Sequence, residues 1–175
     1  SLLFHGKWRF SIVLSWHAAY EKDCARWADL LQWGKCLFGW WSLMRYTFAP
    51  LEGVTGYVYR NLHRRWFGGV ERYYMPFISV GQSRSFSPRE WQDFCPEHNE
   101  SGDLVPQLLG KDAEGFIWAA RELRALGYRE INFNLGCPSG TVTAKGKGAG
   151  FLTRPAELEA FLDRIFSALE GPISI

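Results

Sequence analysis

The stretch Ile131–Leu152 (INFNLGCPSGTVTAKGKGAGFL) restricts the possible folds of this chain more than any other part of its sequence. Its first five residues alternate apolar and amide side chains, which is the period of a β-strand. The strand is expected to end at Gly136–Pro138, because proline cannot donate to a strand ladder and glycine admits unusual backbone angles. Asn134 and Cys137 therefore lie where a strand runs into a glycine-rich, basic loop. In α/β folds the carboxyl ends of strands carry the chemistry, so both residues are candidates for an active site.

Strands and helices are predicted to alternate along most of the chain. Strands are predicted at Tyr46–Pro50, Val70–Ile78, Leu104–Leu109, Ile131–Leu135 and Ile173–Ile175. Helices are predicted from Thr55 or Gly56 to Trp66, as a short turn at Pro88–Phe94, from Asp112 to Leu126, and from Pro155 to Leu169. Short joints between alternating strands and helices favour a parallel sheet.

The predicted fold class is α/β, and the predicted architecture is an incomplete TIM (β/α)8 barrel. A complete barrel of this kind needs about 250 residues. The alternation begins after Met44 and reaches Ile175 within a fifth strand. We therefore expect residues 44–175 to form the N-terminal half of a barrel, about the first four βα units plus the start of strand five.

Residues 1–43 are expected to lie outside this barrel unit. They contain six of the nine tryptophans, and apolar residues from Trp16 to Leu31 recur at helical spacing, which predicts one amphipathic helix around residues 16–33. Met44 directly precedes the first predicted strand. We expect Met44 to be the natural start and residues 1–43 to be an upstream extension. The alternative is an accessory helix that packs on the barrel.

The charge of the chain is unevenly distributed. The net charge of +2 comes from residues 1–43, which carry five Lys or Arg against three Asp or Glu, whereas residues 44–175 carry fifteen of each. The predicted barrel unit is therefore neutral. Any affinity for nucleic acid must come from a local basic patch and not from bulk charge.

The four cysteines, Cys24, Cys36, Cys95 and Cys137, form no C-x-x-C pair and show no regular spacing. This pattern argues against a disulfide framework and against a zinc site. We therefore expect reduced thiols, no metal and a cytoplasmic location. No apolar run approaches the roughly 20 residues that a membrane helix needs, so no membrane partner is expected.

Three motifs, taken together, resemble the flavin-dependent tRNA-dihydrouridine synthases. The first is Asn134–Ser139 (NLGCPS) with the loop 145–150 (KGKGAG); the others are Phe48–Thr55 (FAPLEGVT) and Val105–Gly110 (VPQLLG). They follow one another in the family's order, and the similarity covers residues 44–175. A lone Gly-Cys-Pro would not be specific, whereas this combination is.

The resemblance implies reduction of the C5=C6 bond of uridine in tRNA. This reaction needs a hydride at C6 and a proton at C5, and no side chain supplies a hydride, so a cofactor must. The family uses FMN, recharged by NADPH. By resemblance Cys137 is the proton donor, and a thiol near its reference pKa of about 8.5 is mostly protonated at neutral pH. The alternative is that Cys137 is a small buried hydrophobic residue.

The resemblance also assigns residues that bind the flavin. Ala49, Pro50 and Leu51 match the backbone that lies against the flavin, and Gln107 matches the side chain that bonds its ring. A purely structural glutamine at a strand end is the alternative for Gln107.

Three further residues are assigned to the tRNA. Asn134 matches the amide that contacts the uridine, and an amide has both the donors and the acceptor that suit the edge of uracil. Lys145 and Lys147 are expected to touch the tRNA backbone, with a plain surface loop as the alternative. The expected partners are thus tRNA and NADPH, and the full-length protein is expected to be monomeric.

Two other functions remain open at this point. One is another FMN-dependent TIM-barrel oxidoreductase that acts on a small substrate such as an enone or dihydroorotate; the NLGCPS motif with its basic loop argues against it. The other is an inactive truncated remnant or fragment, which the end of the chain within a predicted strand favours. In a fragment the flavin-contacting lysine of strand five, the phosphate-binding loops of strands seven and eight, and the helical tRNA-binding domain would be missing.

Overall fold

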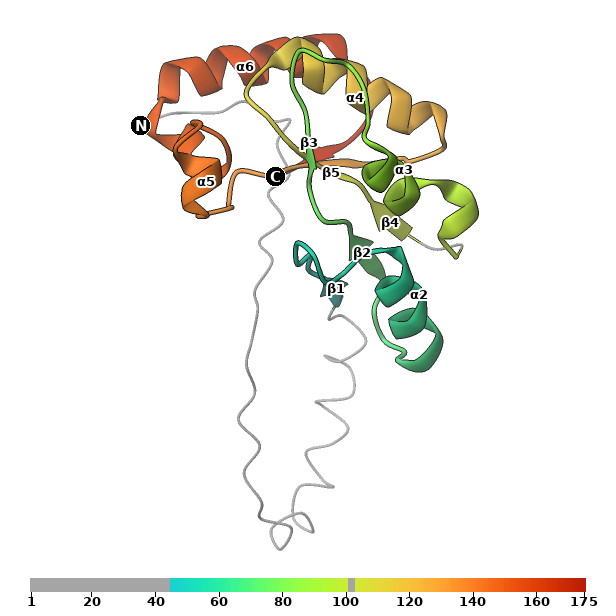
Figure 1. The fold of residues 1–175 in the computed structure, drawn as a ribbon. Coiled ribbons are helices and arrows are strands. Elements are labelled where there is room, and N and C mark those ends of the chain that lie inside the picture. Colours follow the sequence, from blue (N-terminus) through green and yellow to red (C-terminus); the bar gives the residue numbers. More distant parts are fainter. Residues whose placement is uncertain (1–44, 101–102) are drawn as a thin grey trace, which may run out of the picture.

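The computed structural model describes residues 45–100 and 103–175, and it arranges them as parallel strands joined by helices (Figure 1). Within this part of the chain, one sheet has the order β1-β2-β4, formed by Thr47–Phe48, Arg72–Tyr74 and Asp103–Val105. The other has the order β3-β5-β6-β7, formed by Ile78–Ser79, Gln107–Leu109, Ile131–Phe133 and Ile173–Ser174. Every pair of neighbouring strands in these sheets is parallel, as predicted. The helix predicted around residues 16–33 lies outside the described residues.

The second and third predicted strands are each divided in two, the second into β2 and β3 and the third into β4 and β5. A proline lies in each break, Pro76 and Pro106, and proline has no N–H for the ladder. Single backbone hydrogen bonds continue across the breaks: the N–H of Met75 donates to the carbonyl of Val105 (3.0 Å), and the N–H of Asn132 donates to that of Pro106 (2.8 Å). The two sheets are therefore consecutive parts of one wall of strands.

The helices predicted within the described residues all form, with small shifts at their ends. The α-helices of the described residues are α2 (Tyr57–Trp66), α3 (Pro88–Phe94), α4 (Ala113–Ala125), α5 (Gly140–Thr143) and α6 (Pro155–Ala168), and the 3₁₀ helices are η2 (Pro96–His98) and η3 (Gly148–Thr153). Helices α4 and α6 lie side by side over one side of the strands (Figure 1). The prediction of a plain loop between β6 and α6 is wrong, because α5 and η3 form there. Both are too short to show the apolar period by which longer helices are recognised.

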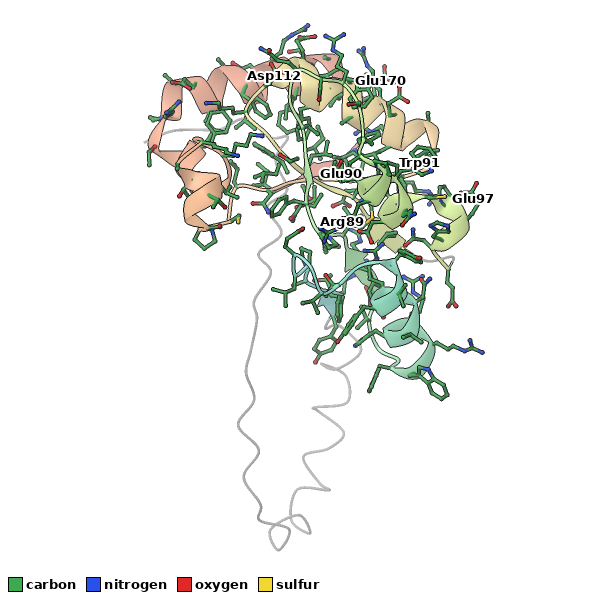
Figure 2. All side chains as sticks on the ribbon, in the orientation of Figure 1. Arg89, Glu90, Trp91, Glu97, Asp112 and Glu170 are labelled. Carbon is green, nitrogen blue, oxygen red and sulfur yellow. The ribbon has the colours of Figure 1, made fainter. Side chains whose placement is uncertain are left out.

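Local hydrogen bonds define where the helices begin and end. The carboxylate of Asp112 accepts the N–H of Gly115 at 2.8 Å and so caps α4 (Figure 2). Gly127, two residues after α4, has a φ of 98°, the left-handed conformation in which many helices end. At α3, Ser87 and Glu90 form a capping box, in which each side chain accepts the other's backbone N–H.

The hydrophobic core lies between the strands and the pair α4 and α6. Phe133 of β6 is 1% exposed, and its ring contacts Phe116 of α4 (5.3 Å between centroids) and Phe161 of α6 (4.9 Å). Leu108 of β5 and Ile165 of α6 are fully buried in the same cluster. Since side chains alternate along a strand, the neighbours of Phe133 point to the opposite side of the sheet, away from these helices.

The described part of the chain is thus a mixed α/β unit of parallel strands and covering helices, which is a partial TIM barrel. The fold class predicted from the sequence is confirmed. None of the helices in the described residues is both long and apolar enough to cross a membrane.

The close approach of α4 to the turn after β3 gives a test of this packing. A Cβ at Gly115 would lie 2.9 Å from the carbonyl carbon of Gly81 and closer still to its oxygen. Gly115→Ala is therefore expected to lower the free energy of unfolding by about 1–3 kcal/mol, as overpacking does, although alanine favours a helix. Urea denaturation measures the change.

The control is Gly140→Ala, at the start of α5, where a Cβ would meet nothing within 4 Å. This variant is expected to match the wild type within about 0.5 kcal/mol. Equal stabilities of the two variants would contradict the packing described for α4.

Candidate active site

A cavity of about 910 Å³ lies at the carboxyl ends of the strands. Its wall is formed by residues 49–52, Tyr74, Pro76, Phe77, Gln107, residues 132–138, Leu152, Leu158, Leu162 and Ile175. Most of these side chains are apolar, and a few amides and one thiol are set among them. This volume and this mixture are typical of sites for small molecules and cofactors.

Most of the residues predicted from the sequence meet in this cavity. Its lining includes all four predicted flavin-binding residues (Ala49, Pro50, Leu51 and Gln107), and also Asn134 and Cys137. They come from the segment after β1, from the start of β5 and from the segment after β6, which parallel pairing brings to the same wall. Lys145 and Lys147 do not line the cavity.

The turn after β1 is held by hydrogen bonds with Thr55, which precedes α2, and with Arg60 of α2. The hydroxyl of Thr55 accepts the N–H of Leu51 at 2.7 Å, and the carbonyl of Thr55 accepts from the Arg60 guanidinium at 2.9 Å. Arg60 is 3% exposed and also donates to the carboxylate of Asp93 (3.1 Å) and to the side chain of Asn99 (2.9 Å). Burial lowers the pKa of Arg60, and Asp93 opposes this shift. Residues 49–51 are therefore positioned by a buried cation between α2 and α3.

A chain of amide hydrogen bonds crosses the cavity wall from β7 to Cys137. The side-chain NH₂ of Asn132 donates to the hydroxyl of Ser174 (3.0 Å), and that of Gln107 donates to the Asn132 oxygen (2.7 Å). The NH₂ of Asn134 donates to the Gln107 oxygen (2.8 Å), and the Asn134 oxygen accepts the backbone N–H of Cys137 (3.0 Å). We call this set of hydrogen bonds the amide chain. It joins three strands and the segment that carries the thiol.

The hydrogen bonds of the amide chain orient its amide groups but leave some of their donors and lone pairs free. Each amide group has two N–H donors and an oxygen with two lone pairs, and the chain uses one donor and one lone pair of Asn134. Asn134 can therefore still hydrogen-bond a ligand in the cavity. Gln107 lines the same cavity at 9% exposure and likewise keeps one donor and one lone pair.

Cys137 is held on both sides of its backbone. Its N–H donates to Asn134, and its carbonyl accepts the N–H of Ala149 at 3.0 Å. Gly148 has a φ of 54°, and a Cβ there would lie 2.7 Å from the Cys137 carbonyl oxygen. Glycine is thus required at this close approach. The Cys137 thiol is half-buried and makes no disulfide.

The two lysines of the loop 145–150 have different surroundings. Lys145 is exposed, whereas Lys147 is half-buried and its amine donates to the Ser79 hydroxyl and the Val80 carbonyl, each at 3.2 Å. Burial lowers the pKa of Lys147, and the neighbouring charges of Lys145 and Lys111 lower it further.

Two members of the amide chain, Asn132 and Ser174, were not among the predicted site residues. Asn132 could have been found, since it shares its strand face with Asn134. Nothing in the sequence marks Ser174, whose role depends on the pairing of β6 with β7. In residues 45–100 and 103–175 no group of His, Cys, Asp and Glu could hold a metal ion.

Removing one member tests the amide chain. Asn132→Leu leaves the Gln107 donor without its acceptor and the Ser174 hydroxyl without its donor. Both groups are buried, so the free energy of unfolding is expected to fall by about 1–3 kcal/mol per unsatisfied group. Ser174→Ala, which removes only the end of the chain, is expected to cost less. If urea denaturation shows that Asn132→Leu and Ser174→Ala lower the free energy of unfolding equally, the amide chain does not contribute to stability as a unit.

Comparison with known proteins identifies relatives of the whole described unit. Residues 47–175 match the family model of dihydrouridine synthase (Dus). The probable tRNA-dihydrouridine synthase 1 of Synechocystis sp. is 28% identical over 128 residues, which are 73% of this chain and 35% of that protein. The tRNA-dihydrouridine synthase B of Vibrio parahaemolyticus is 27% identical over 132 residues, 73% of this chain and 38% of that protein.

A third relative is also a tRNA-dihydrouridine synthase and aligns with a slightly longer part of this chain. The tRNA-dihydrouridine(16) synthase of Cupriavidus necator is 30% identical over 139 residues, 76% of this chain and 42% of that protein. The chain thus spans well under half the length of these relatives. Because the family model covers the strands, the helices and the cavity described above, this chain belongs to the dihydrouridine synthase family.

Proposed function

We propose that the cavity belongs to the active site of an enzyme that reduces the C5=C6 bond of uridine in tRNA, using FMN and NADPH. One observation carries the proposal: hydrogen bonds join the amides of Gln107 and Asn134 to the backbone N–H of Cys137, the residue that carries the thiol, along one wall of a mostly apolar cavity. The names of the relatives, all tRNA-dihydrouridine synthases, support the choice of substrate.

The cavity residues fit a flat heteroaromatic ring such as that of FMN. Apolar groups suit its faces, and the Gln107 amide suits the nitrogen and oxygen atoms along its edge. In this proposal Ala49, Pro50 and Leu51 lie against the ring and Gln107 bonds it. FMN, when bound there, supplies the hydride for C6 and is recharged by NADPH.

Cys137 supplies the second half of the reduction. Its thiol holds a proton and gives it to C5 of the uracil ring. Asn134 holds the edge of the uracil with the donor and the lone pair that the amide chain leaves free.

The remaining contacts with tRNA lie outside the cavity. Lys145 is exposed, and its amine makes no hydrogen bond within the described part of the chain, so it is available to a phosphate. Since residues 44–175 carry no net charge, such local contacts are needed for RNA binding. We propose a cytoplasmic location, where tRNA and NADPH are present.

Cys137→Ala separates the two half-reactions in a chain that contains a complete barrel. NADPH is expected to reduce the flavin at the wild-type rate, because that step does not use the thiol. Dihydrouridine formation in tRNA is expected to fall by about 100-fold or more, the usual contribution of a general acid. Mass spectrometry of the tRNA nucleosides measures the product.

The control is Cys95→Ala. Cys95 is buried outside the cavity, and its thiol donates to the Glu97 carboxylate. This variant is expected to form dihydrouridine at the wild-type rate. Wild-type product formation by Cys137→Ala would rule out Cys137 as the proton donor.

The cavity wall also predicts how the 175-residue chain binds flavins. No residue that lines the cavity in the described part of the chain is Lys, Arg or His, so the phosphate of FMN finds no cation there. FMN and riboflavin are therefore expected to bind this chain with dissociation constants within about threefold of each other. Fluorescence titration measures both. An FMN affinity more than about tenfold higher would show a phosphate site in this chain.

A further inference from the structure

The amine of Lys147 lies against the end of β3. Its two hydrogen bonds, to the Ser79 hydroxyl and the Val80 carbonyl, connect residues 68 and 67 positions apart in the chain. The side chain is half-buried. Lys145, two residues earlier, is exposed and makes no such contact.

The end of β3 is held in place by hydrogen bonds of the backbone N–H groups of Ser79 and Val80. The N–H of Val80 donates to the carbonyl of Leu109 at 2.9 Å, which extends the ladder between β3 and β5. The N–H of Ser79 donates to the carboxylate of Glu90, which lies in the first turn of α3 (Figure 2). Movement of Ser79 and Val80 is therefore opposed from two directions.

On the other side, the residues after Lys147 contact the thiol-bearing segment directly. Ala149 donates its N–H to the Cys137 carbonyl at 3.0 Å. Gly148 packs so closely that a Cβ there would lie 3.1 Å from the Cβ of Cys137. A shift of the backbone at Lys147 would thus be passed on to Cys137 through these two residues.

We propose that Lys147 is a positioning residue, whose amine ties the loop 145–150 to the end of β3 and thereby holds Cys137 against the cavity. Its consequence for catalysis rests on the proposed function, whereas its consequence for the geometry of Cys137 does not. Of the two loop lysines, only Lys145 then contributes a phosphate contact.

The test compares Lys147→Met with Lys145→Met, which removes the same charge from the same loop. The intact chain is treated with iodoacetamide, and peptide mapping by mass spectrometry gives the alkylation rate of Cys137. Lys147→Met is expected to raise this rate at least about threefold, because the freed loop uncovers the thiol. Because Lys145→Met removes the same charge from the same loop, acceleration in Lys147→Met but not in Lys145→Met reports the release of the loop.

Two further variants keep the result interpretable. Lys147→Arg retains donors for both acceptors and is expected to restore the slow rate. Ser79→Ala removes one acceptor at the opposite end of the contact and is expected to accelerate alkylation in the same direction as Lys147→Met. If Lys147→Met is unfolded by circular dichroism, Ser79→Ala decides the outcome.

In a chain that contains a complete barrel, the rate of uridine reduction can be measured as well. Lys147→Met is expected to lower kcat for uridine reduction by about tenfold while leaving the salt dependence of tRNA binding unchanged. Lys145→Met is expected to lower the slope of log affinity against log salt by about 0.9, the value for one phosphate contact. If no variant or wild type reduces uridine, the proposed function fails, and the alkylation rates still decide the role of Lys147.

The proposal is overturned by the reverse pattern. Wild-type alkylation rates in both Lys147→Met and Ser79→Ala would show that the contact does not hold Cys137. A salt slope lowered by Lys147→Met as much as by Lys145→Met would show that Lys147 binds phosphate instead.

Discussion

The parallel register between β5 and β6 is the interaction on which the rest of the site depends. It pairs Gln107 with Asn132 and Leu108 with Phe133, so amides fall on one side of the sheet and apolar side chains on the other. A slip of one residue would turn the ring of Phe133 away from Phe116 and Phe161 and bury the amides among the rings of α4 and α6. Each buried amide group left without a partner would cost about 1–3 kcal/mol. The hydrophobic core and the amide chain therefore select the same register.

The thiol-bearing residue is held between two separate anchors. One is the amide chain, which reaches the backbone N–H of Cys137 from the interior of the sheet. The other is the contact of Ala149 with the Cys137 carbonyl, which extends through Lys147 to the end of β3. A group fixed from both sides needs little rearrangement when a substrate arrives, and such preorganisation is a large part of catalysis. The close approach of Gly148 leaves no room for a side chain between the two anchors.

Much of this structure follows from the periodicity of the sequence, and what does not follow depends on distant contacts. The helix over Pro155–Ala168 and the strand over Ile131–Phe133 show clear apolar periods, and both form as predicted. The cavity residues could be predicted together because parallel strands bring their carboxyl ends to one edge. The prolines that divide two strands were visible, but the backbone bonds that bridge them were not. The different surroundings of Lys145 and Lys147 could not be predicted, since a partner 68 residues away decides them.

The distribution of charge around the cavity limits how an RNA substrate could enter it. The charged residue in the described wall is Glu52, an anion that pairs with Arg89 at 3.7 Å, and the lysines stand outside. A phosphate moved into such an apolar space would lose its hydration without gaining a cation, which is strongly unfavourable. Uracil is neutral and carries donors and acceptors that the free positions of Asn134 can match. For the proposed function, this arrangement favours entry of the base alone. The nucleotide would then leave its stack, while its phosphates stay near Lys145.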